Sequence, residues 1–196
     1  MAEIAVETLW GEATRPVIED LARLRVEVFR DFPYLYDGDF DYERRYLAKF
    51  LGLEDGTIVV ARDGAQVIGA STALPLAKAG RDERRPFVEA GIDVNSVYYF
   101  GESVLRSAYR GRGLGVAFFE RREARARQLG YKLAAFCAVE RPADHPRRPN
   151  DYAPLDAFWA KRGYTRRPEL RTSFSWQDLD ERGESPKPMV FWTRNL

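Results

Sequence analysis

The chain has 196 residues, the length of one domain, and 45% of them are hydrophobic and 31% charged, which predicts a packed core rather than disorder. A single cysteine, Cys137, excludes an internal disulfide framework, and together with a single histidine, His145, it argues against cysteine-rich and histidine-based metal sites, so no metal is expected. No apolar run reaches the roughly 18–20 residues of a membrane helix, and residues 1–4 show no signal-peptide pattern. The net charge of +1 argues against nucleic-acid binding. We therefore expect a cytoplasmic protein without membrane or nucleic-acid partners.

The charge is unevenly distributed along the chain. Residues 1–100 carry 12 basic and 18 acidic side chains, whereas residues 101–169 carry 15 basic and 8 acidic ones. The first part is therefore expected to attract cations and the second to attract anions, unless both signs are simply spread over a solvated surface.

The first half of the chain predicts an initial strand, two helices, a hairpin and a third helix. Alternation of Ile4, Val6 and Thr8 with polar residues is typical of a strand, and Asp63-Gly64 is a strong hairpin-turn signal. The expected elements are a strand at residues 3–9, a helix with Thr14 as N-cap that is ended by Pro33, a helix at about 41–53, strands at 57–62 and 66–74, and a helix at 81–90.

The second half alternates strands with helices and ends on a pair of strands. The expected elements are a strand at 97–105, a helix from the following Gly-rich turn to about Leu129, a buried strand at 132–139, a proline-rich loop at 141–154, a short helix that stops at Gly163, and strands at 170–176 and 189–194. Helices alternate with strands in the middle and hairpins stand at the ends, which predicts a mixed α/β sheet.

The most informative segment is the turn Arg110-Gly111-Arg112-Gly113-Leu114-Gly115, between a strand and a helix. The first N–H groups of a helix have no acceptor within the helix, and with the helix dipole they favour an anion. Glycines let the backbone approach phosphate oxygens closely, and the two arginines add positive charge. The spacing lacks both the Gly-Lys-Ser/Thr of a Walker A loop and the offset of the dinucleotide-binding Gly-x-Gly-x-x-Gly pattern.

Arg110-x-x-Gly113-x-Gly115, preceded by the strand at 97–105, resembles the acyl-CoA-binding motif of the GNAT superfamily of N-acyltransferases. The order of elements is similar over roughly residues 3–176, and residues 158–164 resemble the last helix of the family and its following Gly-aromatic pair. The resemblance implies a GNAT-like α+β mixed sheet of about seven strands and four helices, in one domain over residues 1–196. It also implies a sheet that splays between strands 97–105 and 132–139, with Gly101 at the bulge that opens it.

The resemblance further implies acetyl-CoA as co-substrate and assigns residues to it. Backbone groups of Leu105, Arg106 and Ser107 are implied to pair with the pantetheine arm. Backbone N–H groups of Arg110, Gly111, Arg112, Gly113, Leu114, Gly115 and Val116 are implied to hold the pyrophosphate, and the Arg110 and Arg112 side chains to meet the remaining phosphates.

The implied reaction is transfer of an acetyl group to a primary amine by direct attack in a ternary complex. We expect Glu102 to be the base, since apolar neighbours on its strand would bring its pKa towards the working range; the alternative is a structural glutamate paired with an arginine. The N–H of Leu105 is expected to hold the oxyanion. Trp159 stands where family members often carry a tyrosine acid, which leaves Tyr152, Tyr164 or a water for that role, with Trp159 as a packing residue.

The acceptor side is expected in the loop between the first two helices. Tyr34, Tyr36 and Asp37, with Asp39 and Asp41 nearby, form an aromatic and acidic cluster that suits a cationic amine; the alternative is a turn whose aromatic rings fill the core. His145 is expected either to act as a base or substrate contact, or to be exposed and inert. Cys137 is expected in the core rather than as an acyl-enzyme nucleophile.

Two other functions compete with acetyl transfer, and a homodimer is expected in addition. A catalytically silent acyl-CoA-binding or sensing module is the main alternative, because of Trp159, and a nucleic-acid contact by the arginine-rich motif is a third. The apolar strand at residues 189–193 is expected to be exposed and to pair with a second copy, giving a homodimer.

Overall fold

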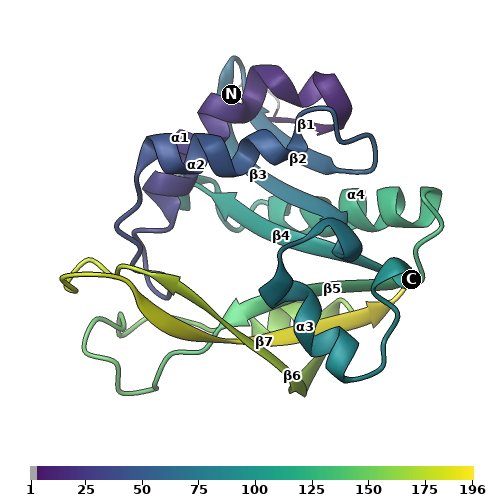
Figure 1. Ribbon diagram of the computed structural model, residues 1–196. Coiled ribbons are helices and arrows are strands. Elements are labelled where there is room, and N and C mark those ends of the chain that lie inside the picture. Colours follow the sequence, from purple (N-terminus) through teal and green to yellow (C-terminus); the bar gives the residue numbers. More distant parts are fainter. Residues whose placement is uncertain (1–3) are drawn as a thin grey trace.

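The computed structural model describes residues 4–196, which form one seven-stranded sheet in the order β1-β2-β3-β4-β5-β7-β6 (Figure 1). The strands are β1 (Ile4–Leu9), β2 (Thr57–Asp63), β3 (Gln66–Pro75), β4 (Val97–Leu105), β5 (Leu133–Val139), β6 (Thr165–Trp176) and β7 (Ser185–Asn195). The α-helices of the described residues are α1 (Ile18–Val28), α2 (Phe40–Leu47), α3 (Arg81–Glu89), α4 (Leu114–Gln128) and α5 (Asp156–Lys161). Adjacent strands pair antiparallel except β4 and β5, which are parallel. The expected mixed sheet is therefore confirmed, with five α-helices in the described residues where about four were expected; the short α5 is the helix predicted to stop at Gly163.

The largest departures from the expected elements lie near the N-terminus. A 3-10 turn (Gly11–Val17) precedes α1, and the Thr14 hydroxyl donates to the Gly11 carbonyl oxygen at 2.7 Å, so Thr14 is not an N-cap. α1 ends at Val28, well before Pro33, and α2 ends at Leu47 rather than near residue 53. Glu3, the expected start of the first strand, lies outside the described residues.

Helices cover both faces of the sheet. α1, α2 and α3 lie in front of the sheet in Figure 1 and α4 lies behind it. α1, α2 and α3 contribute Leu21, Leu47 and Phe87 to the largest core cluster, whereas α4 contributes Phe118 and Phe119 to clusters on its own side. No helix in residues 4–196 is long and apolar enough to cross a membrane.

The expectation that residues 189–193 form an exposed strand is wrong. They belong to β7, which pairs with β5 on one side and with β6 on the other, and Met189 to Trp192 are buried. Because both edges of β7 are used by the sheet itself, this strand does not provide an edge for a second copy.

The sheet opens between β4 and β5, as the resemblance implied. Their parallel pairing covers only Val97–Tyr99 against Leu133–Ala135, so the rest of each strand faces an unpaired gap. The β3–β4 register shifts between Ser71 and Ala73, where Gly101 and Glu102 stand opposite the single residue Thr72. A Cβ on Gly101 would lie 2.5 Å from Thr72 Oγ1, so only glycine fits. The predicted bulge at Gly101 is therefore confirmed, and it places Glu102 beside the gap.

Candidate active site

The turn before α4 is an open cradle of backbone N–H groups. Gly111 and Gly113 have φ of 75° and 83°, a region that favours glycine, and a Cβ on either would meet nothing within 4 Å. Within residues 4–196, no acceptor bonds the N–H groups from Gly111 to Val116. Free N–H groups at a helix N-terminus with open space before them fit the pyrophosphate of a CoA ester.

The three arginines near the cradle differ in how firmly they are held. Arg106 forms a bidentate pair with Glu27, at 3.0 and 3.1 Å. Arg110 lies 3.4 Å from Asp31, and Arg112 donates to the Ala108 carbonyl at 3.1 Å; both are exposed side chains. Because an exposed pair contributes little free energy, Arg110 and Arg112 are free to turn towards a phosphate, whereas Arg106 is not.

Only every second residue of β4 directs its backbone N–H group into the β4–β5 gap. The Arg106 N–H donates to the Ile68 carbonyl of β3 at 3.0 Å, so it is not available to a pantetheine arm. Alternation in an antiparallel ladder then directs the N–H groups of Ser103 and Leu105 away from β3, towards the gap. Leu105 keeps its expected position, and Ser103 is a second donor that the sequence reading missed.

Glu102 belongs to a buried ion cluster. Its Oε1 lies 2.8 Å from Nη1 of Arg25, and Nε of Arg25 donates to Glu43 Oε2. Glu102 is 8% exposed and Glu43 is fully buried, with its Oε1 unbonded. One guanidinium between two carboxylates leaves a net charge of −1. The alternative reading of Glu102, a structural glutamate paired with an arginine, thus describes the contact that its side chain makes.

Aromatic rings surround this cluster. The Arg25 guanidinium lies 4.9 Å from the ring centroid of Phe29 and 4.7 Å from that of Tyr46. Burial opposes the charge of Arg25, but Glu102, Tyr46 and Glu43 outweigh it and raise its pKa. Burial raises the pKa of Tyr46 and lowers that of Lys49. The result is a buried, strongly charged site beside the gap, in which the Lys49 amine also lies within electrostatic range of Glu102.

The sequence reading missed Arg25 and Glu43, although each stands at a core position of its helix. Arg25 follows Leu21 by four residues and precedes Val28 by three, and Glu43 precedes the buried Leu47 by four. A charged residue at a core position of an amphipathic helix was the sequence signal that could have identified both residues.

The predicted acceptor loop is held against the β6–β7 hairpin. Tyr36 forms a β-bridge with Asp178, the Asp37 N–H donates to the Gln177 carbonyl at 3.0 Å, and the Trp176 indole donates to the Tyr34 carbonyl at 3.0 Å. Burial raises the pKa of both Tyr34 and Tyr36. Asp37 points outward to Arg30, 2.9 Å away.

Arg141, at the start of the proline-rich loop, fixes the same region. It forms a buried bidentate pair with Asp178, at 2.8 and 2.9 Å, and donates to the Pro33 and Tyr34 carbonyls at 2.7 and 2.8 Å. The acceptor loop is therefore preorganised by two segments distant in sequence.

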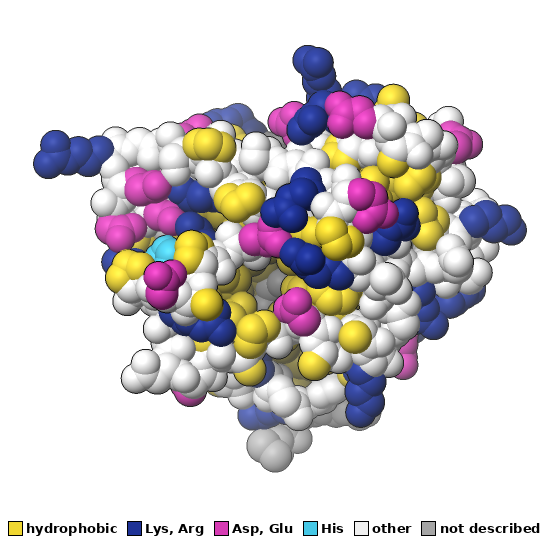
Figure 2. Space-filling view, turned by 90° about the horizontal axis from the view of Figure 1, so that it is seen from below, with side chains coloured by type: hydrophobic (Ala, Val, Ile, Leu, Met, Phe, Trp, Pro, Cys, Tyr) yellow, Lys and Arg dark blue, Asp and Glu magenta, His cyan; other side chains and the backbone are white. Residues whose placement is uncertain are grey.

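The structure brings His145 and Tyr152 together at this loop. Phe32 lies 4.7 Å from the Tyr152 ring and 5.6 Å from the His145 ring, and the Arg148 guanidinium is 4.8 Å from the Tyr152 ring. Figure 2 shows this histidine, in cyan, on a face that is hollowed near its middle, with hydrophobic side chains in the hollow and charged ones at its rim.

Of the two candidate acids, Tyr164 has its hydroxyl committed elsewhere. It is buried and donates to Glu123 Oε1 at 3.0 Å, and burial with the Glu123 charge raises its pKa. The Trp159 ring packs 5.0 Å from Phe136 and 5.2 Å from Trp192, as a packing residue does. Tyr152 is partly exposed, and its hydroxyl forms no hydrogen bond within residues 4–196.

Cys137 lies in the core, as expected. Its Sγ is 3.2 Å from the Tyr99 hydroxyl, and burial raises the pKa of the thiol to about 12, which disfavours the nucleophilic thiolate. In the described part of the chain, no three His, Cys, Asp or Glu side chains gather as metal ligands.

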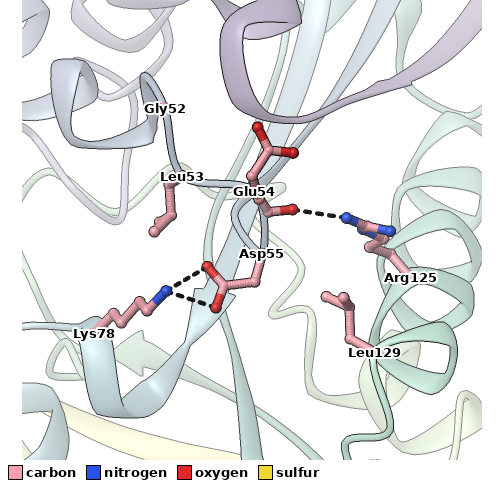
Figure 3. A pocket seen from close by; sticks show the side chains of 7 residues that line it. All are labelled: Gly52, Leu53, Glu54, Asp55, Lys78, Arg125 and Leu129. Carbon is pink, nitrogen blue, oxygen red and sulfur yellow. Dashed lines mark hydrogen bonds and ion pairs between the residues drawn. The ribbon is translucent and has the colours of Figure 1, made fainter.

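A surface pocket of about 490 Å³ lies at the other end of α4 (Figure 3). Its two basic side chains are already bonded: Lys78 pairs with Asp55 at 2.7 Å, and Arg125 donates to the Glu54 backbone carbonyl at 2.8 Å. It contains none of the groups described above, so we place the candidate active site at the β4–β5 gap instead.

The fold and the cradle together define an acyl-CoA-dependent transferase. The family model of the acetyltransferase (GNAT) family matches residues 19–149, and the chain belongs to this family. It is thus an acyltransferase.

Solved structures with a similar fold have low sequence identity to this chain. Ribosomal-protein-alanine N-acetyltransferase from Brucella melitensis is 13% identical over 98% of this chain and 99% of that one, with a TM-score of 0.61. Drosophila melanogaster polyamine N-acetyltransferase, which forms N-acetylagmatine, is 16% identical over 99% and 100%, with a TM-score of 0.61. The yncA protein of Salmonella typhimurium, solved with its cofactor acetyl-CoA, is 14% identical over 98% and 94%, with a TM-score of 0.57. No curated protein matches the sequence.

Proposed function

We propose that this protein transfers the acetyl group of acetyl-CoA to a primary amine by direct attack in a ternary complex. The observation that carries the proposal is the position of Glu102, a nearly buried carboxylate at a bulge beside the gap, on the strand that leads to the N–H cradle. Direct attack needs no acyl-enzyme, which agrees with the buried, protonated thiol of Cys137.

The residues that would hold acetyl-CoA are those of the cradle and of the β4 edge. N–H groups from Gly111 to Val116, with the side chains of Arg110 and Arg112, would bind the phosphates. The backbone groups of Leu105 and Ser107 would bond the pantetheine arm. Bound there, acetyl-CoA supplies a thioester whose acyl carbon accepts the amine.

In this reaction the chain's own groups accept a proton from the amine, stabilise the negative charge on the thioester oxygen and donate a proton to the leaving thiolate. Glu102 takes a proton from the ammonium, so that the nitrogen lone pair can form the C–N bond. As the C–S bond then breaks, the nitrogen loses its second proton to water and the amide is neutral. The N–H group of Ser103 stabilises the negative charge on the thioester oxygen, while that of Leu105, two residues further along the strand, bonds the pantetheine arm. The leaving thiolate takes a proton from Tyr152, whose hydroxyl is free, or from water.

The acceptor enters at the loop bearing Tyr34, Tyr36 and Asp37, with His145 at its rim. We propose a cationic amine, because two buried carboxylates, those of Glu43 and Glu102, share the one guanidinium of Arg25, and aromatic rings surround them. The Drosophila neighbour, which acts on polyamines, supports the same class. We further propose that residues 1–196 act as one domain in the cytoplasm.

Calorimetric titration with acetyl-CoA, followed by an assay of CoA release with monoamines, polyamines and peptide N-termini, tests the proposal. We expect one acetyl-CoA per chain and turnover with cationic amines. Glu102→Gln should keep the affinity for acetyl-CoA while the turnover falls by about 10²–10⁴ and loses its pH dependence. Binding without turnover in the wild type would instead identify a catalytically silent acyl-CoA-binding module, and no binding would exclude both.

A further inference from the structure

Arg122, on α4, reaches the β4 bulge from the face opposite α1. Its side chain is 2% exposed. Nη1 donates to the Thr72 carbonyl at 3.3 Å and to the Glu102 carbonyl at 3.4 Å, and Nη2 donates to Ser103 Oγ at 3.0 Å. Three of its contacts thus belong to the bulge or to the residue directly after it.

This arginine is not held there by a carboxylate. Among the described residues it forms no ion pair, and burial lowers its pKa to about 10. Burying an unpaired charge is unfavourable, so the position does not serve stability through charge pairing. The ring centroids of Phe100 and Phe119, 4.4 and 5.0 Å from the guanidinium, fix its plane.

The β4 bulge explains why the buried residue at this position is an arginine. Two β4 residues face one β3 residue, so the ladder is interrupted, and the carbonyls of Thr72 and Glu102 are bonded by Arg122 instead. A lysine offers one point charge, whereas the guanidinium reaches two carbonyls and a hydroxyl with a planar fork. Arg122 therefore sets the geometry of the bulge.

Glu102 is held from both faces of the sheet. Arg25 of α1 pairs with its carboxylate, and Arg122 of α4 bonds its carbonyl. The Glu102 carbonyl belongs to the same peptide group as the Ser103 N–H, which faces the gap. A cation that bonds the carbonyl polarises this peptide and makes its N–H a stronger donor.

We propose that Arg122 is a positioning residue of the acetyl transfer: by fixing the β4 bulge it directs the Glu102 carboxylate at the attacking amine and the Ser103 N–H at the thioester oxygen. The inference rests on the proposed function of Glu102. It places a residue in the reaction that lies on the far side of the sheet from the acceptor loop and touches neither substrate.

The test compares Arg122→Met and Arg122→Lys with Arg125→Met. Arg125 is a matched control because it lies one turn further along α4 and also donates to a carbonyl, that of Glu54. We expect Arg122→Met to lower kcat by about 100-fold, the effect of a misplaced reacting group, with an unchanged KM for acetyl-CoA and an unchanged calorimetric affinity. Arg122→Lys should recover part of kcat, and Arg125→Met should match the wild type.

Hydrogen exchange provides a second readout. Amides of residues 100–105 should exchange faster in Arg122→Met than in the wild type, whereas those of β1 and β2 should not change. If Arg122→Met does not fold, Ser103→Ala removes the Nη2 acceptor alone and should lower kcat in the same direction. Wild-type turnover with an undiminished kcat in the folded variants would overturn this inference alone, whereas absence of turnover in the wild type would overturn the proposed function as well.

Discussion

Arg25 is the single positive charge between two buried carboxylates, those of Glu43 and Glu102. Its removal would leave both carboxylates facing one another in a region of low polarity. Like charges at short range are far more unfavourable there than in water. The stability of the α1–α2 pair and the geometry of Glu102 therefore depend on the same side chain.

Arg25→Met should lower the free energy of unfolding by about 3–5 kcal/mol, the usual effect of breaking a buried pair. Arg23→Met is the control, because Arg23 pairs with Glu19 at 3.2 Å on the exposed side of the same helix, and it should change stability by less than about 1 kcal/mol. Urea unfolding followed by circular dichroism measures both, and equal losses would contradict the role of the cluster.

The same residues show what could be read from the sequence and what could not. Glu102 was identifiable because it is an acidic residue on an otherwise apolar strand that leads into a Gly-rich turn. Arg122 was not, because Arg121, Arg122, Arg125 and Arg127 look alike in α4, and only Arg122 is buried. Which of several helix arginines faces the sheet depends on packing, not on composition.

At the scale of elements, α4 carries a left-handed glycine at each end. Gly113 precedes it with φ of 83°, and Gly130 follows it with φ of 85°, and a Cβ on either would meet nothing within 4 Å. The backbone strain of an alanine should therefore be the same at both positions, about 1 kcal/mol. Only Gly113 borders the cradle, where the open space is expected to hold phosphate.

Gly113→Ala should weaken acetyl-CoA binding by about tenfold, because the added methyl group would stand in the open space of the cradle and separate the phosphate from one N–H donor, about the value of one hydrogen bond to a charged group. Gly130→Ala should leave the affinity unchanged although both variants lose similar stability. Calorimetry with acetyl-CoA and thermal unfolding without it separate the two effects. Parallel losses of affinity would indicate that strain, and not the cradle, determines binding.

The bounds of helices and strands agree with the predicted ones where a local sequence signal defines them. β4 has the predicted bounds, and the turn at Asp63-Gly64 joins β2 to β3 as expected. β6 and β7 are longer than predicted, since they include prolines and polar residues that do not alternate. Pairing between the two strands extends them, with a register shift between Arg167 and Arg171, and such pairing is not encoded in either strand alone.

At the scale of the whole molecule, several phenol groups and the single thiol are buried as neutral species. Burial raises the pKa of Tyr34, Tyr46 and Tyr99, and that of Cys137 to about 12. These groups keep their protons in the folded chain at pH values where the unfolded chain has released them. Folding therefore binds protons in alkaline solution, and stability must fall as the pH rises.

The free energy of unfolding should be nearly constant up to about pH 8 and fall above about pH 9, where an unfolded thiol and then unfolded phenols ionise. Each proton that only the folded chain retains contributes a slope of about −1.4 kcal/mol per pH unit. Arg122 and Lys49 contribute with the opposite sign, because burial lowers their pKa values in the folded chain, but the phenols outnumber them. Urea unfolding across this range measures the slope.

Tyr99→Phe should flatten the alkaline slope, because it removes one buried hydroxyl, the one that contacts Cys137. Tyr42→Phe should leave the slope unchanged, since that side chain is 53% exposed and water reaches it in both states. A slope that is the same for both variants and the wild type would show that other groups govern the alkaline unfolding. A flattened slope in Tyr99→Phe alone would assign part of the alkaline sensitivity to the hydroxyl–thiol pair behind the β4–β5 gap.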